Sequence, residues 1–104
     1  MSAGHARVIV WHQAPDGDTA ELERAYHAIS EQLDGTPGLV ANELLRSVRK
    51  PGYFAVLSEW ASLADFQAWE QGPEHRKDTS PLRPYQEKDR PGGHYEIYEV
   101  AAAH

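Results

Sequence analysis

The order of strand-like and helix-like segments constrains the fold of this 104-residue chain more than any other feature. Four segments are rich in β-branched and aromatic residues, a composition typical of strands. They are residues 6–12, 39–47, 53–60 and 94–100. Two segments with apolar residues at helical spacing interrupt them, one after Asp18 and one after Ser62, each an expected helix N-cap. The order βαββαβ predicts a ferredoxin-like α+β fold, in which two helices cover one face of a four-stranded antiparallel sheet.

Glycine and proline residues mark where these segments end. The Arg-Lys-Pro-Gly sequence of residues 49–52 predicts a tight turn, so the second and third strands should form a hairpin. The Gly-Pro pair at residues 72–73 ends the second helix. Residues 79–93 are polar and contain three prolines and two glycines, which predicts a long surface loop with room for one helical turn. Whether this loop closes over a pocket stays open.

The strands carry apolar residues on both faces. In the third strand, Phe54 and Val56 alternate with Tyr53, Ala55 and Leu57. A sheet that is apolar on both faces is usually covered on both. The chain offers helices for one face only, so the other face is predicted to pack against the same face of a second copy. The expected assembly is a homodimer with two sheets face to face, a dimeric α+β barrel.

Length and composition bound the class of protein. A chain of 104 residues is expected to form one domain over residues 1–104, with a core from about residue 6 to residue 100. The net charge of −6 disfavours nucleic acid and anionic membranes as partners. No apolar run approaches the roughly 20 residues of a membrane span, and the N-terminus lacks the layout of a signal peptide, so a cytoplasmic location is expected. The absence of cysteine excludes thiolate chemistry.

The stretch from Trp60 to His75 is the strongest candidate for a functional site. Trp60, Phe66 and Trp69 place three aromatic rings close together in sequence, and Phe66 and Trp69 share one helix face. His75 follows just past the Gly-Pro break. Aromatic walls beside one titratable group are typical of a pocket for a flat, oxidisable molecule. The alternative is structural, because the tryptophans can be core residues and His75 can cap backbone carbonyls.

Three sequence motifs occur together in this chain. The first is a Pro-Gly entry into the second strand, within residues 36–47, and the second is the strand of residues 54–60, which ends in tryptophan. The third runs from Phe-Gln-Ala-Trp at residues 66–69 to the Gly-Pro-Glu-His corner at residues 72–75. Together they resemble the antibiotic biosynthesis monooxygenase family of dimeric α+β barrels, which includes small quinol and anthrone oxygenases. The resemblance covers residues 8–100 and implies the same fold.

The resemblance also implies which chemistry to expect. Quinol-type members of the family keep the Pro-x-His corner, which His75 fills here. Anthrone oxygenases place an asparagine on the third strand and a tyrosine on the second helix, where this chain has Val56 and Phe66. Haem-degrading members have a haem-ligating histidine beyond the helix tryptophan, at the place of Thr79. The resemblance therefore favours a cofactor-free, quinol-like reaction over haem degradation.

Other polar residues are further candidates. Arg76, beside His75, could hold an enolate or peroxide anion, although such an arginine is more often a solvated surface charge. His12 and Asn42 could hydrogen-bond a substrate oxygen if their side chains face the helices, and the Tyr26 hydroxyl could lie at the pocket rim. The six histidines lack metal-ligand spacing, so no metal site is predicted. With no glycine-rich phosphate loop either, no cofactor is expected.

The sequence thus predicts a monooxygenase that needs neither metal nor flavin and oxidises a phenolic, quinol or anthrone-type aromatic with O₂. His75 is the predicted base, Arg76 the predicted anion stabiliser, and Trp60, Phe66 and Trp69 the predicted walls. Two alternatives stay open: a non-oxidative cyclase or isomerase of polyketide-like substrates on the same scaffold, and a non-catalytic protein that binds small molecules. The identity of the substrate and any sharing of the site across the dimer are not determined by the sequence.

Overall fold

The structure of the protein is a computed structural model, which describes residues 4–14, 18–72 and 80–104. In chain order its elements are β1 (Ala6–Gln13), α1 (Thr19–Leu33), β2 (Leu39–Arg46), β3 (Tyr53–Trp60), α2 (Leu63–Gln71), the 3₁₀ helix η2 (Ser80–Tyr85) and β4 (Tyr95–Glu99). The strands form one antiparallel sheet in the order β2-β3-β1-β4. The predicted ferredoxin-like fold, with its four-stranded sheet and βαββαβ order, is therefore confirmed.

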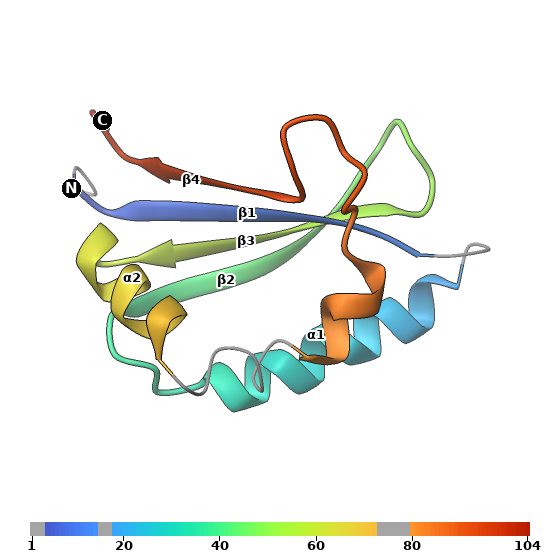
Figure 1. The fold of residues 1–104 in the computed structure, drawn as a ribbon, viewed down its shortest axis with the longest axis horizontal. Helices are drawn as coiled ribbons and strands as arrows, with labels where there is room; N and C mark the ends of the chain where they lie inside the picture. The colour runs from blue at the N-terminus through green and yellow to red at the C-terminus, as the bar shows by residue number, and fades with distance from the viewer. Residues whose placement is uncertain (1–3, 15–17, 73–79) are drawn as a thin grey trace.

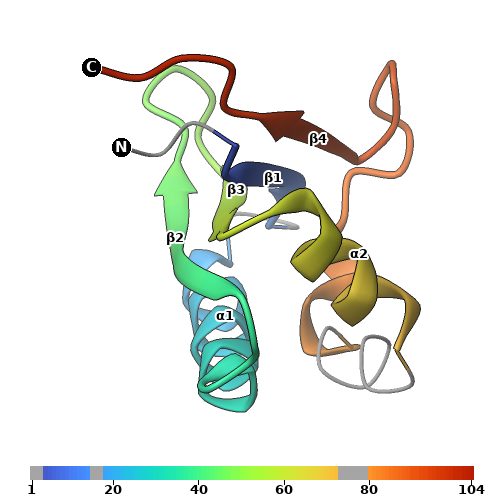
Figure 2. The ribbon, with the colours of Figure 1, turned by 90° about the vertical axis from the view of Figure 1, so that its left-hand side faces the viewer.

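The helices lie on one face of the sheet, which we call the inner face. α1 runs beneath the β2 side of the sheet, whereas α2 lies beneath the side of β1 and β4 (Figures 1 and 2). η2 lies on the same face and packs against α1. No helix of the described chain covers the opposite face, which we call the outer face and which points upward in Figure 1. The molecule therefore consists of a sheet layer and a helical layer.

Short polar side chains begin both α-helices. The Asp18 carboxylate accepts a hydrogen bond from the Glu21 backbone N–H at 3.3 Å, and the Ser62 hydroxyl accepts one from the Asp65 N–H at 3.1 Å. Both predicted N-caps are therefore confirmed. Within the described part of the chain, none of the helices is long and apolar enough to cross a membrane.

A glycine fixes the entry into β2. Gly38 has a φ of 83°, and a Cβ at this position would collide with the Asp65 side chain of α2. Its carbonyl accepts a hydrogen bond from the Ala61 N–H at 2.8 Å. These contacts hold the start of β2 beside the start of α2, and the close approach of Asp65 explains why a glycine precedes the strand.

Strand alternation separates the core from the outer face. On β1, Val8 and His12 are 4% and 2% exposed on the inner face, whereas Ile9 and Trp11 point outward. The face of β1 that meets the helices, which the sequence left undecided, is thus that of Val8 and His12. The other large side chains of the buried core come from α1, β3, α2 and η2: Leu22, Ile29, Leu33, Phe54, Trp60, Phe66 and Leu82.

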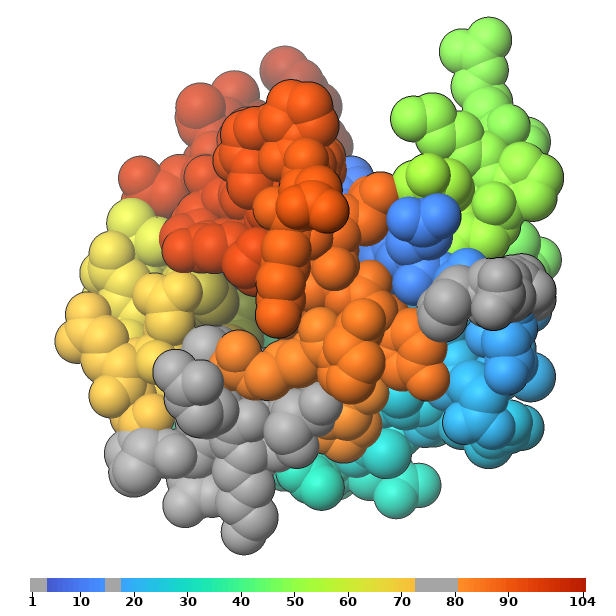
Figure 3. Space-filling view, turned by 45° about the vertical axis from the view of Figure 1, so that its right-hand side comes forward, coloured from blue at the N-terminus to red at the C-terminus, as the bar shows by residue number. Residues whose placement is uncertain are grey.

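Part of the predicted surface loop is buried. In η2, Leu82 is 4% exposed and packs in the core, and Tyr85 packs against the same cluster. Residues 86–93 then cross to the outer face, where the Arg90 guanidinium lies 3.4 Å from the centroid of the Trp11 ring. In Figure 3 this loop and the β2–β3 hairpin, drawn in green, form two separate projections. The segment therefore contributes to the core at its start and to the outer face at its end.

Candidate functional site

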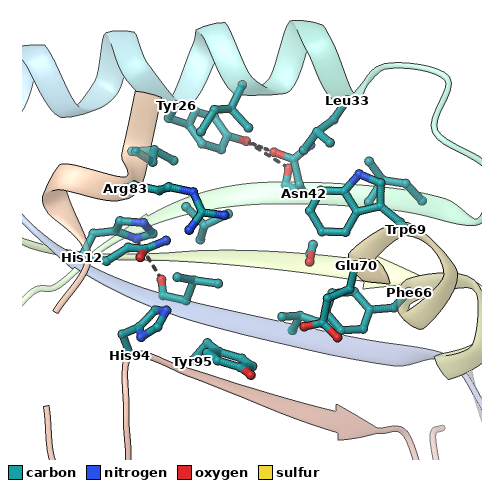
Figure 4. Close-up of a pocket in the computed structure, with 18 of the residues that line it drawn as sticks. His12, Tyr26, Leu33, Asn42, Phe66, Trp69, Glu70, Arg83, His94 and Tyr95 are labelled. Atoms are coloured by element: carbon teal, nitrogen blue, oxygen red, sulfur yellow. Dashed lines mark hydrogen bonds between the residues drawn. The ribbon is translucent and has the colours of Figure 1, made fainter. Parts of the chain in front are cut away.

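A cavity of about 210 Å³ lies between the inner face of the sheet and the helices. In the orientation of Figure 4, β1 and β3 form the floor of the cavity and α1 forms its roof. The helices η2 and α2 close its two ends (Figure 4). Much of the lining is apolar, with residues such as Val8, Ile29 and Val56. The cavity is smaller than the roughly 300–1,000 Å³ of typical ligand sites, so it can take a small ligand.

All six residues predicted to contact a substrate line this cavity: His12, Tyr26, Asn42, Trp60, Phe66 and Trp69. They belong to β1, α1, β2, β3 and α2, so folding collects them from separate parts of the chain. Their contact with a ligand stays a prediction. The predicted catalytic residues His75 and Arg76 lie outside the described residues.

Aromatic rings form one end of the cavity. The ring centroid of Trp60 lies 5.4 Å from that of Phe66 and 5.3 Å from that of Trp69. Trp60 is 1% exposed, and its indole N–H donates a hydrogen bond to the Ser58 hydroxyl at 3.0 Å. Trp60 therefore belongs both to the core and to the cavity wall. The Glu70 carboxylate lies at the same end (Figure 4).

A neutral histidine lies at the opposite end. Burial lowers the pKa of His12 from 6.5 to about 4; the hydrogen bond with Val10 opposes this effect, and nearby His94 adds to it. Nδ1 of His12 lies 3.0 Å from the Val10 carbonyl oxygen. A carbonyl can only accept, so Nδ1 carries the proton of the neutral ring. Nε2 is therefore left as a hydrogen-bond acceptor for a ligand.

Arg83 of η2 adds a cation that was not among the predicted site residues. Its side chain lines the cavity near His12 (Figure 4). Its Nε is buried and has no hydrogen-bond partner among the residues that the structure describes. Burial, Lys88 and Arg83 together hold the pKa of His94 below its usual range. This end of the cavity thus combines a fixed positive charge with neutral imidazoles.

The composition of residues 79–93 does not predict that Arg83 lines the cavity, because polar residues with several prolines are typical of a solvated loop. One feature of the sequence does indicate that part of this segment is buried: Leu82 and Tyr85 are two large side chains with apolar surface. Burying them brings Arg83, which lies between them in sequence, to the cavity. His94 lines the cavity as well, because it directly precedes β4.

A hydrogen-bond network connects the roof of the cavity to its wall. The Tyr26 hydroxyl donates to Oδ1 of Asn42 and lies 3.2 Å from the Asn42 backbone carbonyl oxygen (Figure 4). The Ser30 hydroxyl also donates to Oδ1 of Asn42, at 3.2 Å. The network ties α1 to β2 and holds the Asn42 side chain in place.

This arrangement can bind a flat ring and stabilise negative charge on it. The mostly apolar walls offer few polar groups that could screen the Arg83 guanidinium, which strengthens its field inside the cavity. Nε2 of His12 can accept a hydrogen bond from a hydroxyl group. In residues 4–14, 18–72 and 80–104, no group of three or more His, Cys, Asp or Glu side chains could hold a metal ion.

Sequence comparisons identify relatives of the chain. Residues 6–77 match the family model of the antibiotic biosynthesis monooxygenases. Protein SchA of Streptomyces halstedii is 34% identical over 85 residues, which are 82% of this chain and 22% of SchA. The heme oxygenase (mycobilin-producing) of Mycobacterium tuberculosis is 33% identical over 61 residues, which are 59% of this chain and 58% of that protein. The chain thus spans about a fifth of the length of SchA.

A solved structure shares the fold. SnoaB, a cofactor-independent oxygenase from Streptomyces nogalater solved as a point variant, has a TM-score of 0.78 with this chain. The match covers 97% of each chain at 17% sequence identity. At this identity the likeness concerns the fold alone, so the chemistry of the cavity has to be argued from its own side chains.

Proposed function

Because the chain belongs to the antibiotic biosynthesis monooxygenase family, we propose that it is a cofactor-independent monooxygenase that oxidises a phenolic, quinol or anthrone-type aromatic with O₂. One observation carries the proposal: the Arg83 side chain lines an aromatic-walled, largely apolar cavity and brings a positive charge to it (Figure 4). An aromatic oxyanion matches both the walls and the cation.

The cavity walls bind the substrate and remove its water. Trp60, Phe66 and Trp69 stack against its rings, while the valines of β1 and β3 exclude solvent. In this water-poor site, Arg83 stabilises an oxyanion more strongly than an exposed arginine would. Nε2 of His12 accepts a hydrogen bond from a substrate hydroxyl and so helps to orient the rings.

The redox chemistry belongs to the substrate. A base removes a proton from the substrate, and the resulting anion passes one electron to O₂. The substrate radical and superoxide then combine to a peroxide anion, which takes up a proton. Loss of water leaves a new carbonyl group, so one atom of O₂ enters the product and the other leaves as water. Arg83 lowers the energy of both the substrate anion and the peroxide anion.

His75 is the proposed base, on the strength of its place in the Gly-Pro-Glu-His corner and of the ordinary titration range of histidine. His12 is a weaker base, because its pKa of about 4 leaves it little tendency to take up a proton at neutral pH. For the anion, Arg83 takes precedence over Arg76, since its side chain lines the cavity. Arg76 stays the second candidate.

We further propose that the chain forms a homodimer through its outer face. Leu45 and Tyr98 are 42% and 51% exposed there, beside Ile9, Trp11 and Leu57 of the central strands. An exposed apolar patch of this kind marks an interaction surface. Two copies related by a two-fold axis would cover the patch on both sheets at once.

Haem is the alternative substrate that the heme oxygenase relative suggests. A haem macrocycle, with four pyrrole rings and two propionates, is larger than a cavity of about 210 Å³. Thr79, at the place of the haem-ligating histidine, lies outside the described residues. The described cavity therefore favours the smaller aromatic, and a Soret band after addition of haem would favour haem instead.

Oxygen uptake tests the proposed reaction. The purified protein, without added metal or flavin, should consume O₂ with anthrone or with a naphthalene-derived quinol, and His75→Ala should lower the rate by about 10². Equal rates for the wild type and His75→Ala would contradict the assignment of the base. Turnover under strict anaerobiosis would favour the cyclase or isomerase, and binding without turnover would favour the binding protein.

A further inference from the structure

Asn42 is a cavity residue to which the proposed reaction assigns no task. It lies on the inner face of β2, opposite Ser58 of β3 in the strand register. Its side chain lines the cavity under α1 (Figure 4). It is therefore placed to touch any ligand that fills the space between the sheet and α1.

The oxygen of the Asn42 carboxamide is already occupied. Tyr26 and Ser30, four residues apart on one face of α1, both donate their hydroxyl protons to Oδ1. A carboxamide oxygen has two lone pairs, so these two donors saturate it. In the structure the two hydroxyls therefore face the oxygen end of the carboxamide.

The nitrogen of the same carboxamide is unused. Nδ2 carries two N–H donors, and neither has an acceptor among the residues that the structure describes. Unlike the Arg83 Nε, Nδ2 is not sealed from solvent. Asn42 therefore offers a donor, and not an acceptor, to a molecule in the cavity.

We propose that Asn42 is a specificity-determining residue that donates a hydrogen bond from Nδ2 to a carbonyl oxygen of the substrate. The preferred substrate is then an aromatic ketone, in which Asn42 holds the carbonyl oxygen. If that ketone is deprotonated, the same N–H stabilises the enolate oxygen that forms. The inference rests on the proposed function in taking this cavity as the substrate site. Tyr26 and Ser30 act through Asn42 and are positioning residues.

Two probes that differ by one carbonyl group test this role without turnover. α-Tetralone and tetralin have the same fused-ring skeleton, and only the ketone can accept a hydrogen bond. Their dissociation constants can be measured anaerobically from tryptophan fluorescence, since Trp60 and Trp69 line the cavity. Asn42→Leu should weaken α-tetralone binding about tenfold and change tetralin binding less than twofold.

A double variant tests the positioning. Tyr26→Phe with Ser30→Ala keeps Asn42 but removes both donors to Oδ1, so the carboxamide can turn. α-Tetralone should then bind severalfold more weakly, again with little change for tetralin. This variant supplies the test on its own should Asn42→Leu not fold.

The results that overturn the inference are specific. The inference is wrong if Asn42→Leu weakens the binding of α-tetralone and tetralin to the same extent, or weakens the binding of neither. It is also wrong if the wild type binds neither probe. A ketone preference that depends on Asn42, in a protein that consumes no O₂ with any aromatic tested, would overturn the proposed function instead. Oxygen uptake with no dependence of α-tetralone binding on Asn42 would do the reverse.

Discussion

At the scale of single residues, Arg83 contributes the charge on which the proposed chemistry depends. Its Nε has no partner in the described chain, so the folded protein gains little stability from it. We predict that Arg83→Met lowers kcat/KM by about 10² to 10³. The free energy of unfolding should stay unchanged or rise by about 1 kcal/mol, because a buried unsatisfied donor is removed. Oxygen-uptake kinetics and urea denaturation measure the two effects.

Arg49→Met is the matched control, since Arg49 is exposed in the turn between β2 and β3. It removes the same charge without touching the cavity, and both measurements should stay close to the wild type. A loss of stability in Arg83→Met with unchanged kinetics would instead make Arg83 a structural residue.

His12 links the cavity to the pH dependence of stability. Its pKa in the folded protein, about 4, lies below its ordinary value of 6.5, so protonation favours the unfolded chain. The contribution of neutral His12 is complete above pH 6.5 and is lost as the pH falls towards 4. The whole difference corresponds to about 3 kcal/mol.

The fall in the free energy of unfolding between pH 7 and pH 4.5 should therefore be about 2 kcal/mol smaller in His12→Gln than in the wild type. Urea denaturation at both pH values measures it, and the comparison removes the effect of the carboxylates that both proteins share. Equal falls in the two proteins would show that His12 is not held neutral by burial.

At the scale of elements, η2 both completes the core and closes the cavity. Leu82 is 4% exposed and packs in the cluster that includes Leu22 and Ile29 of α1. Leu82→Ala should cost about 2–4 kcal/mol of unfolding free energy and lower activity, because it loosens the helix that carries Arg83. Val48→Ala is the control, since Val48 is 98% exposed, and it should stay within about 0.5 kcal/mol of the wild type. A small effect of Leu82→Ala would mean that η2 is not anchored through this side chain.

The elements that the sequence predicts well are those with local signals. Asp18 and Ser62 begin helices because each side chain accepts a hydrogen bond within its own first turn. The β2–β3 hairpin follows from one short turn. η2 has no such signal, because its conformation depends on the contact of Leu82 with α1, a residue far away in sequence. Tertiary packing therefore determines the conformation of η2, although its polar composition is typical of a solvated loop.

The candidate site could be predicted in the same partial way. Trp60, Phe66 and Trp69 could be predicted to lie together, because these aromatic residues are close in the sequence as well as in the folded chain. The face of β1 that carries His12 could not be chosen from a strand that is apolar on both sides. Arg83 was not predicted, because its place at the cavity follows from the packing of η2.

At the scale of the whole molecule, the two faces of the sheet have different tasks. The inner face and the helices enclose the cavity, whereas the outer face carries the apolar side chains through which we propose that a second copy binds. Leu57 lies in the middle of the outer face, paired with Ile9 and Glu43. Leu57→Glu should turn a dimer into a monomer in sedimentation velocity, because it would bury a charge between the sheets.

Ala28→Glu is the control for this experiment, since Ala28 is exposed on α1, away from the outer face. It adds the same charge and should leave the dimer intact. A wild type that sediments as a monomer, or a dimer that survives Leu57→Glu, would contradict an interface on the outer face.

The reaction itself is tested most directly by the origin of the oxygen in the product. The purified, metal-free and flavin-free protein should be supplied with an anthrone and ¹⁸O₂, and the product analysed by mass spectrometry. We predict one labelled atom in the new carbonyl group for each molecule of O₂ consumed, and a much slower reaction in Arg83→Met. A product without ¹⁸O, whose new oxygen atom then comes from water, or a product that forms without O₂, would contradict a cofactor-independent oxygenase.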